Sequence, residues 1–274
     1  MSKKAKRLAK AISKSAPNHT HDYTSSDPSA ARPTDNSPFV HQRDKIDWSL
    51  SIRERGDLTD KQKQYRDLIL DKKTKVVFIN GPAGTSKTYL AIYCGLLLLN
   101  MRRVSHLTFV RTIAESASKS LGSLPGEAND KMSPYLMPLM DKLDELLPSG
   151  EVKRLMAEER ARGMPVNYLR GASMNAQYIV VEEAQNYDIK ELTTVLTRIG
   201  QYSKMIIIGD TMQSDINGRS GFLPLFDWFN QPSSQEQGIH CVSFTKDDIV
   251  RSGILRHIAE MLERYQETHP TKAH

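Results

Sequence analysis

The sequence predicts an α/β fold in which helices cover both faces of a parallel sheet. Two observations carry this prediction: short apolar, β-branched runs alternate with longer segments of helical periodicity, and a glycine-rich loop joins the first apolar run to a helix. The expected strands span residues 75–80, 106–111, 178–182, 204–209 and 239–245.

Helical patterns fill the gaps between these strands. We expect helices at 59–71, 87–100, 188–199 and 248–264. The second of these is apolar almost all round, as expected for a helix packed on a sheet. Residues 115–164 contain no convincing strand and are predicted to form a helical insertion, with helices near 131–147 and 151–160.

Residues 1–47 are predicted to form a flexible basic arm, because they are rich in Lys, Ser, Pro, Asp and Asn and contain few large apolar residues. Residues 48–274 are expected to form the folded domain. The chain has 38 basic and 32 acidic residues, a net charge of +6, and its first 21 residues contain basic but no acidic side chains. The arm therefore holds much of the positive charge, which serves either solubility or attachment to an anionic partner.

No segment resembles a secretory signal or a membrane span, so we expect a soluble, cytoplasmic protein with no membrane partner. Cys94 and Cys241 lie in apolar segments and are expected to be buried, reduced thiols. The eight His residues are scattered without ligand spacing. No metal site formed by the protein alone is therefore expected.

The strand 75–80 runs directly into a glycine-rich loop, and a helix follows. The loop consists of Gly81, Pro82, Ala83, Gly84, Thr85, Ser86, Lys87 and Thr88. This strand–loop–helix context is typical of a P-loop that binds the triphosphate of ATP through backbone N–H groups. Lys87 is expected to reach the β and γ phosphates, and the Thr88 hydroxyl to ligate Mg²⁺.

Ser86 departs from the usual P-loop pattern, because it stands where the second Gly belongs. Unlike Gly, Ser carries a Cβ that the loop must accommodate. We expect the loop to tolerate Ser86, and the substitution Ser86→Gly to preserve ATP hydrolysis.

The apolar strand 178–182 ends in two acids, which places carboxylates at the edge of the sheet where ligands bind. Glu182 is expected to hold the magnesium shell, and Glu183 to orient and deprotonate the attacking water. The alternative is that both acids are exposed and cap the following helix.

The strand 204–209 leads into a further polar segment at the same edge. Gln213 is a candidate sensor of the γ-phosphate. Taken alone, a strand followed by Gly209 and Asp210 fits a simple turn equally well.

In order along the chain, these motifs resemble the PhoH-like family of P-loop ATPases, whose core is similar to that of superfamily 1 helicases (RecA-like), over about residues 57–265. The segment around Gln62 looks like that family's adenine-binding segment, which implies that Gln62 reads adenine, with Gln64 as the neighbouring alternative. Further similar segments are 110–111, 121–126, 134–138, 169–171, 196–200 and 244–251.

The sequence departs from the family pattern at Ser86, at Glu182, which replaces an Asp, and at Ser252, which replaces a His. The longer Glu182 side chain is expected to alter the magnesium geometry. No nuclease domain follows His274 in this sequence, so the nuclease-fused members of the family are not the expected form.

The resemblance implies an ATPase with ATP and Mg²⁺ as cofactors, coupled to single-stranded RNA or DNA. The alternatives are a P-loop kinase, and a nucleotide-dependent interaction protein without motor activity. Basic side chains of the insertion either line a path for nucleic-acid phosphates or form a solvated helix face. They are Lys119, Lys131, Lys142, Lys153, Arg154, Arg160 and Arg162.

The chain has room for one helicase-like core, whereas a strand motor of this class generally needs two facing cores. We therefore expect a ring-shaped homo-oligomer, a hexamer by analogy with the family, with sites at subunit boundaries. Arg251 is the candidate that stabilises phosphate charge across the boundary, and Arg198 is the runner-up. Alternatively, Arg251 caps local carbonyls or pairs with Asp247 or Asp248.

Overall fold

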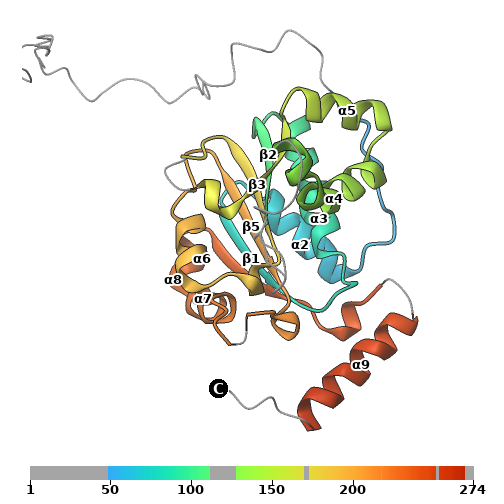
Figure 1. Cartoon of the computed structure of the whole chain (residues 1–274), viewed down its shortest axis with the longest axis vertical. Helices are drawn as coiled ribbons and strands as arrows, with labels where there is room; N and C mark the ends of the chain where they lie inside the picture. The colour runs from blue at the N-terminus through green and yellow to red at the C-terminus, as the bar shows by residue number, and fades with distance from the viewer. Residues whose placement is uncertain (1–48, 112–127, 170–172, 217, 251–252, 269–274) are drawn as a thin grey trace, which may run out of the picture. The chain divides into compact units, whose positions relative to one another are not determined.

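Six parallel strands form one sheet in the computed structural model, which describes residues 49–111, 128–169, 173–216, 218–250 and 253–268. The strand order is β3-β2-β4-β5-β1-β6 (Figure 1). The strands are β1 (Val76–Asn80), β2 (His106–Arg111), β3 (Ala161–Pro165), β4 (Gln177–Glu182), β5 (Lys204–Gly209) and β6 (Ile239–Ser243). This sheet and the helices around it form the α/β fold of a P-loop NTPase, as predicted.

Helices cover both faces of the sheet (Figure 1). On one face lie α2 (Asp60–Leu70), α3 (Lys87–Asn100), α4 (Ala128–Leu146) and α5 (Ser149–Ala157). On the other lie α6 (Ile189–Leu196) and α7 (Phe222–Phe229), while α8 (Pro232–Glu236) leads into β6 and α9 (Gly253–Thr268) follows it. Alternate residues of each central strand point to opposite faces of the sheet. Val77 packs under α3 and Phe78 packs against α7, and both side chains are fully buried. A strand buried on both faces must be apolar throughout, which is why the sequence predicts it well.

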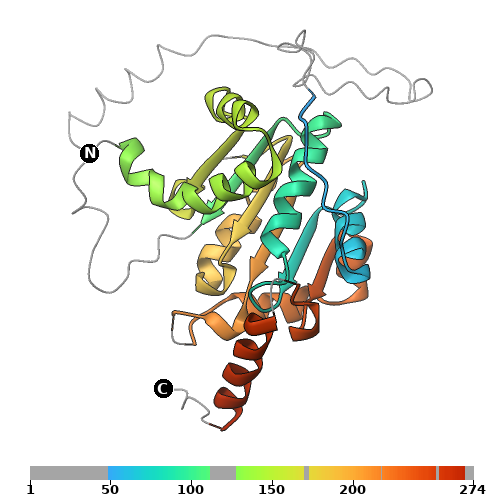
Figure 2. The same cartoon turned by 90° about the vertical axis from the view of Figure 1, so that its right-hand side faces the viewer.

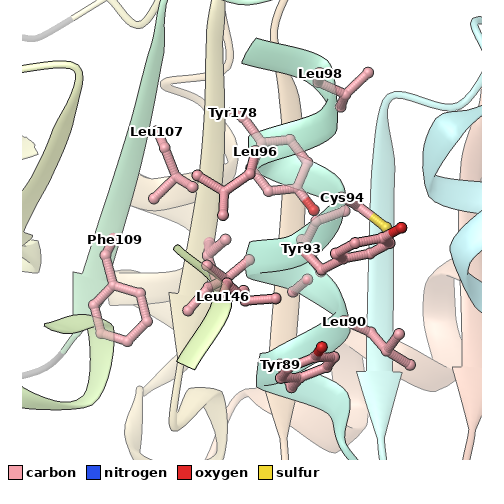
Figure 3. Close-up of a cluster of buried hydrophobic side chains, with 14 of the residues drawn as sticks. Tyr89, Leu90, Tyr93, Cys94, Leu96, Leu98, Leu107, Phe109, Leu146 and Tyr178 are labelled. Atoms are coloured by element: carbon pink, nitrogen blue, oxygen red, sulfur yellow. The ribbon is translucent and has the colours of Figure 1, made fainter. Parts of the chain in front are cut away.

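Gly95 allows α3 to lie close against the sheet. A Cβ atom at this position would lie 2.7 Å from Cδ1 of Tyr178 and 2.8 Å from Cδ1 of Leu107. Figure 3 shows these two strand side chains beside the helix, within the larger of the two cores. The helix that follows the P-loop is therefore held tightly against β2 and β4.

Side-chain caps set the starts of two helices. The Thr59 side chain accepts the Gln62 N–H, and the Gln62 side chain accepts the Thr59 N–H. Asp188 and Glu191 form the same reciprocal pair before α6. Such caps satisfy N–H groups that have no partner within the helix, and each contributes about 1 kcal/mol.

The prediction that the insertion contains no strand was wrong, because β3 pairs with β2 along the edge of the sheet. The segment Ala-Arg-Gly-Met-Pro has weak β propensity, and its Pro165 is tolerated because it ends an edge strand. The predicted start of the last helix was also wrong. Lys246–Asp248 forms a 3-10 turn, and α9 begins only at Gly253.

The predicted arm 1–47 and the segment 121–126 lie outside the described residues. Within the described part of the chain, Cys94 is buried, Cys241 is half-buried, and both are free thiols. No described helix is long and apolar enough to cross a membrane. The same residues contain no group of three or more His, Cys, Asp or Glu side chains able to hold a metal ion.

Candidate nucleotide-binding site

The P-loop joins the carboxyl end of β1 to the amino end of α3 (Figure 2). Gly81 approaches Phe244 so closely that an added Cβ would lie 2.6 Å from the Phe244 Cβ. Ser86 caps α3 in the left-handed conformation, with φ 63° and ψ 23°, and its side chain makes no capping hydrogen bond. Ser86, which stands where the P-loop pattern has Gly, therefore adopts a backbone conformation that Gly adopts more readily.

Lys87 folds back over its own loop. Its Nζ donates to the carbonyl oxygens of Gly81 at 2.6 Å and Pro82 at 2.7 Å. Burial lowers the pKa of Lys87, while the nearby acids Asp210, Glu182 and Glu183 act in the opposite direction. A buried ammonium group whose partners are two loop carbonyls can transfer its hydrogen bonds to phosphate oxygens.

Glu182 ends β4 and meets the P-loop helix directly, because the Thr88 hydroxyl donates to its Oε1. Burial raises the pKa of Glu182, the Thr88 hydrogen bond lowers it, and the neighbouring Glu183 raises it again. A hydroxyl and a carboxylate in contact are oxygen donors of the kind that Mg²⁺ prefers. The residues present therefore fit a magnesium ion carried by a nucleotide.

Glu183 follows in a left-handed conformation, with φ 54° and ψ 40°. Its Oε1 lies 3.5 Å from Nη2 of Arg111, and its Oε2 accepts a hydrogen bond from Nε2 of Gln185 at 2.5 Å. The side chain is 35% exposed. A non-glycine residue in this conformation is uncommon, and such residues are frequent at functional sites.

Asp210 joins the site although sequence analysis assigned it no role. Its Oδ1 accepts the Met212 N–H at 3.0 Å, and its own N–H donates to Oε1 of Gln185 at 3.0 Å. Burial raises the pKa of Asp210, and the charge of Lys87 lowers it. In the sequence, the signal that could have identified Asp210 was its position directly after a buried strand. Its proximity to Lys87 depends on the order of the strands.

These residues surround one cavity of about 560 Å³ at the carboxyl edge of the sheet. It is lined by P-loop residues, by Glu182, Glu183 and Asp210, and by Gln213. Helix α4 of the insertion contributes another part of the wall, which the sequence did not reveal. These α4 residues are Pro138, Asp141, Lys142 and Glu145.

A second cavity of about 550 Å³ adjoins the first, and Glu183 and Gln213 line both. Its other lining residues are Arg111, Asn186, Met212, Ser214 and Asp215. Glu183 therefore stands at the boundary between the two cavities.

Of the predicted residues outside the P-loop that the structure describes, Gln62 and Arg198 do not line the nucleotide cavity. Gln62 is 1% exposed, and its Nε2 donates to the Thr85 carbonyl at 3.2 Å, so it supports the P-loop from behind. Arg198 lies beside the Met174–Ile199 bridge, at the opposite, amino-terminal edge of the sheet. Arg251 lies outside the described residues. Adenine recognition by Gln62 stays a prediction.

Comparison with known proteins agrees with the resemblance seen in the motifs. A family described as PhoH-like protein matches residues 56–263. A PhoH-like protein of Mycobacterium bovis is 36% identical over 208 residues, which cover 75% of this chain and 57% of that protein. A PhoH-like protein of Bacillus subtilis is 34% identical over 72% of this chain and 60% of that protein. A PhoH-like protein of Synechocystis is 33% identical over 81% of this chain and 67% of that protein.

Among solved structures, the Pif1 helicase from Candida albicans is similar with a TM-score of 0.39 and 14% sequence identity, over 77% of this chain and 44% of that chain. This chain spans little more than half the length of the mycobacterial relative. The family match nevertheless covers three-quarters of this chain, from ahead of α2 into α9. The chain therefore belongs to the PhoH-like protein family.

Proposed function

We propose that this protein binds ATP with Mg²⁺ and hydrolyses it. The observation that carries the proposal is the convergence of Lys87, Thr88, Glu182 and Glu183 on one cavity at the carboxyl edge of a parallel sheet. These groups come from two strand ends far apart in sequence. A cation, a hydroxyl and two carboxylates supply the groups that phosphoryl transfer to water requires.

Each side chain has a role in this proposal. Lys87 releases the carbonyls of Gly81 and Pro82 and binds the β and γ phosphates. Thr88 and Glu182 hold Mg²⁺, which when bound neutralises charge on the phosphate oxygens. Glu183 orients the attacking water and accepts its proton, and Gln213 senses the γ-phosphate.

Two substitutions test the assignment. Lys87→Ala should abolish hydrolysis and weaken ATP binding, because the charge facing the phosphates is lost. Glu183→Gln keeps the shape of the side chain but cannot act as a base, so ATP should bind without being hydrolysed. Release of free phosphate and binding of a fluorescent ATP analogue report the two effects. Normal turnover of Glu183→Gln would transfer the base role, with Glu182 the first acid to test.

The kinase alternative uses the same P-loop but needs an acceptor molecule. Free phosphate released without any acceptor supports hydrolysis. Phosphate transfer that appears only when an acceptor is added would overturn the assignment of hydrolysis. Glu183 beside Glu182 favours hydrolysis, because a kinase needs no base directed at water.

We further propose that hydrolysis is coupled to single-stranded RNA or DNA, on the strength of the family resemblance and the net charge of +6. Two basic residues of the insertion have partners within the protein. Arg162 donates to Thr108 and Gln177, and Lys142 pairs with Glu145 at 2.7 Å. Turnover with and without RNA, single-stranded DNA and duplex tests the coupling. Binding with no negative dependence on salt would remove it and favour a nucleotide-dependent interaction protein.

The proposed homo-oligomeric ring has support in α9. One face of this helix carries exposed apolar side chains at helical spacing, which commonly marks an interaction surface. They are Ile254, Ile258, Met261, Leu262 and Tyr265. Arg251 precedes the helix by two positions in sequence, so contacts of α9 with another copy would bring Arg251 near a subunit boundary.

Mixing variants tests the shared site. An inactive Lys87→Ala chain with an intact Arg251 should rescue an Arg251→Ala chain when the two co-assemble. Absence of rescue, or full activity of a monomer in solution, would contradict the ring. Arg198→Ala tests the second candidate in the same assay. Because Arg198 lies at the far edge of the sheet, it could reach the nucleotide only from another copy of the chain. The hexameric size and the cytoplasmic location stay predictions.

A further inference from the structure

Arg111 is a charged residue at the end of a strand whose central residues are all buried. It follows the buried residues Leu107, Phe109 and Val110 of β2 and lies opposite Glu182 in the register of β2 with β4. This register brings its guanidinium group to the pair of acids at the end of β4. Strand pairing therefore places this charge at the site, where Arg111 lines the second cavity.

Both oxygens of the Glu183 carboxylate have a partner, and the partners come from different elements. Arg111 of β2 approaches Oε1 at 3.5 Å, and Gln185 donates to Oε2 at 2.5 Å. Gln185 is itself 1% exposed and is fixed by the backbone N–H of Asp210. The carboxylate is therefore oriented from two sides, at the boundary of the two cavities.

Arg111 also provides a positive charge beside the two acids. In the proposed reaction Lys87 turns towards the phosphates, so Arg111 is the cation that stays beside the two acids. A cation that stays beside the two acids attracts them and helps to hold them in place.

The contact is not one that chiefly stabilises the fold. The side chains of Arg111 and Glu183 are 31% and 35% exposed, and an ion pair of this length and exposure contributes little to folding. We propose that Arg111 is a positioning residue for Glu183, which holds the general base at the angle that water attack requires. This inference rests on the proposed hydrolysis of ATP.

The test compares Arg111→Gln, Arg111→Lys and the control Arg66→Gln. Arg66 is also paired with an acid, Asp67, and is 32% exposed, so its substitution removes the same charge on α2. Arg111→Gln should lower kcat about 10- to 100-fold, because misplacing a reacting group has effects of this size, and leave KM for ATP nearly unchanged. Arg111→Lys retains the charge and should recover most of the loss.

Several results would overturn the inference. They are an unchanged or raised kcat in Arg111→Gln, an equal loss in Arg111→Lys and Arg111→Gln, or a loss in KM alone. If Arg111→Gln does not fold, as judged by circular dichroism, Arg111→Lys decides: a folded Arg111→Lys chain whose kcat is within about threefold of the unsubstituted protein supports the role, and a larger loss contradicts it.

The Glu183→Gln chain separates this inference from the proposed function. If the unsubstituted protein hydrolyses ATP and Glu183→Gln does not, the function holds and Arg111 is judged by its own variants. If Glu183→Gln turns over normally, the base assignment fails, and the inference about Arg111 fails with it.

Discussion

Replacing Ser86 with Gly tests the departure from the usual P-loop pattern. The Ser86 backbone lies at φ 63° and ψ 23°, and its side chain makes no capping hydrogen bond to α3. A left-handed conformation costs an L-residue about 1–2 kcal/mol, and Gly is free of this cost. Gly in turn makes the unfolded chain more flexible, which lowers stability by about 0.4–1 kcal/mol.

The two effects leave a small net gain. We expect Ser86→Gly to raise the free energy of unfolding by about 0.8 kcal/mol, the difference of the two effects at mid-range. In a domain of this size that corresponds to about 2–3 °C in Tm. Ser86→Ala is the matched control, because it removes the hydroxyl and keeps the left-handed strain. Chemical denaturation reports stability, and phosphate release reports turnover.

The control separates strain from chemistry. If strain alone distinguishes Ser86 from Gly, both variants hydrolyse ATP and only Ser86→Gly is stabilised. A loss of turnover in Ser86→Ala and Ser86→Gly alike would show that the hydroxyl has a catalytic role. A clear destabilisation of Ser86→Gly alone would refute the strain argument.

Three further predictions follow from buried contacts. Gly95→Ala should lower the free energy of unfolding by about 1–3 kcal/mol, measured by denaturation, because the new methyl group would lie within 3 Å of Tyr178 and Leu107; an unchanged value would refute the close packing. Burial lowers the pKa of Lys204 from its usual 10.5 to about 8, so between these pH values the unfolded chain binds more protons than the folded chain. The stability of the protein relative to Lys204→Met should therefore rise between about pH 8 and pH 10.5. A flat difference would contradict the shift. Gln62→Ala should weaken the preference for ATP over GTP in competition binding if Gln62 reads adenine, and only loosen the P-loop if its bond to Thr85 is its whole role.

The sequence by itself determined the elements whose signals are local. Strand β2, helix α3 and strand β5 were predicted to the residue, because each is a mainly apolar run bounded by polar residues or glycine. The P-loop was predicted because its pattern, the strand before it and the helix after it are contiguous in the chain. The capping residue Asp188 marked the start of α6 in the same local way.

Only the tertiary structure decided which distant residues meet. The weak segment of β3 becomes a strand because β2 offers it an edge, and α4 forms a wall of the nucleotide cavity because it packs on α3. Asp210 reaches Lys87, and Arg111 reaches Glu183, through the order β2-β4-β5-β1 of the sheet. Strand order is set by packing and pairing between segments far apart in sequence, and no periodicity or motif within one segment records it.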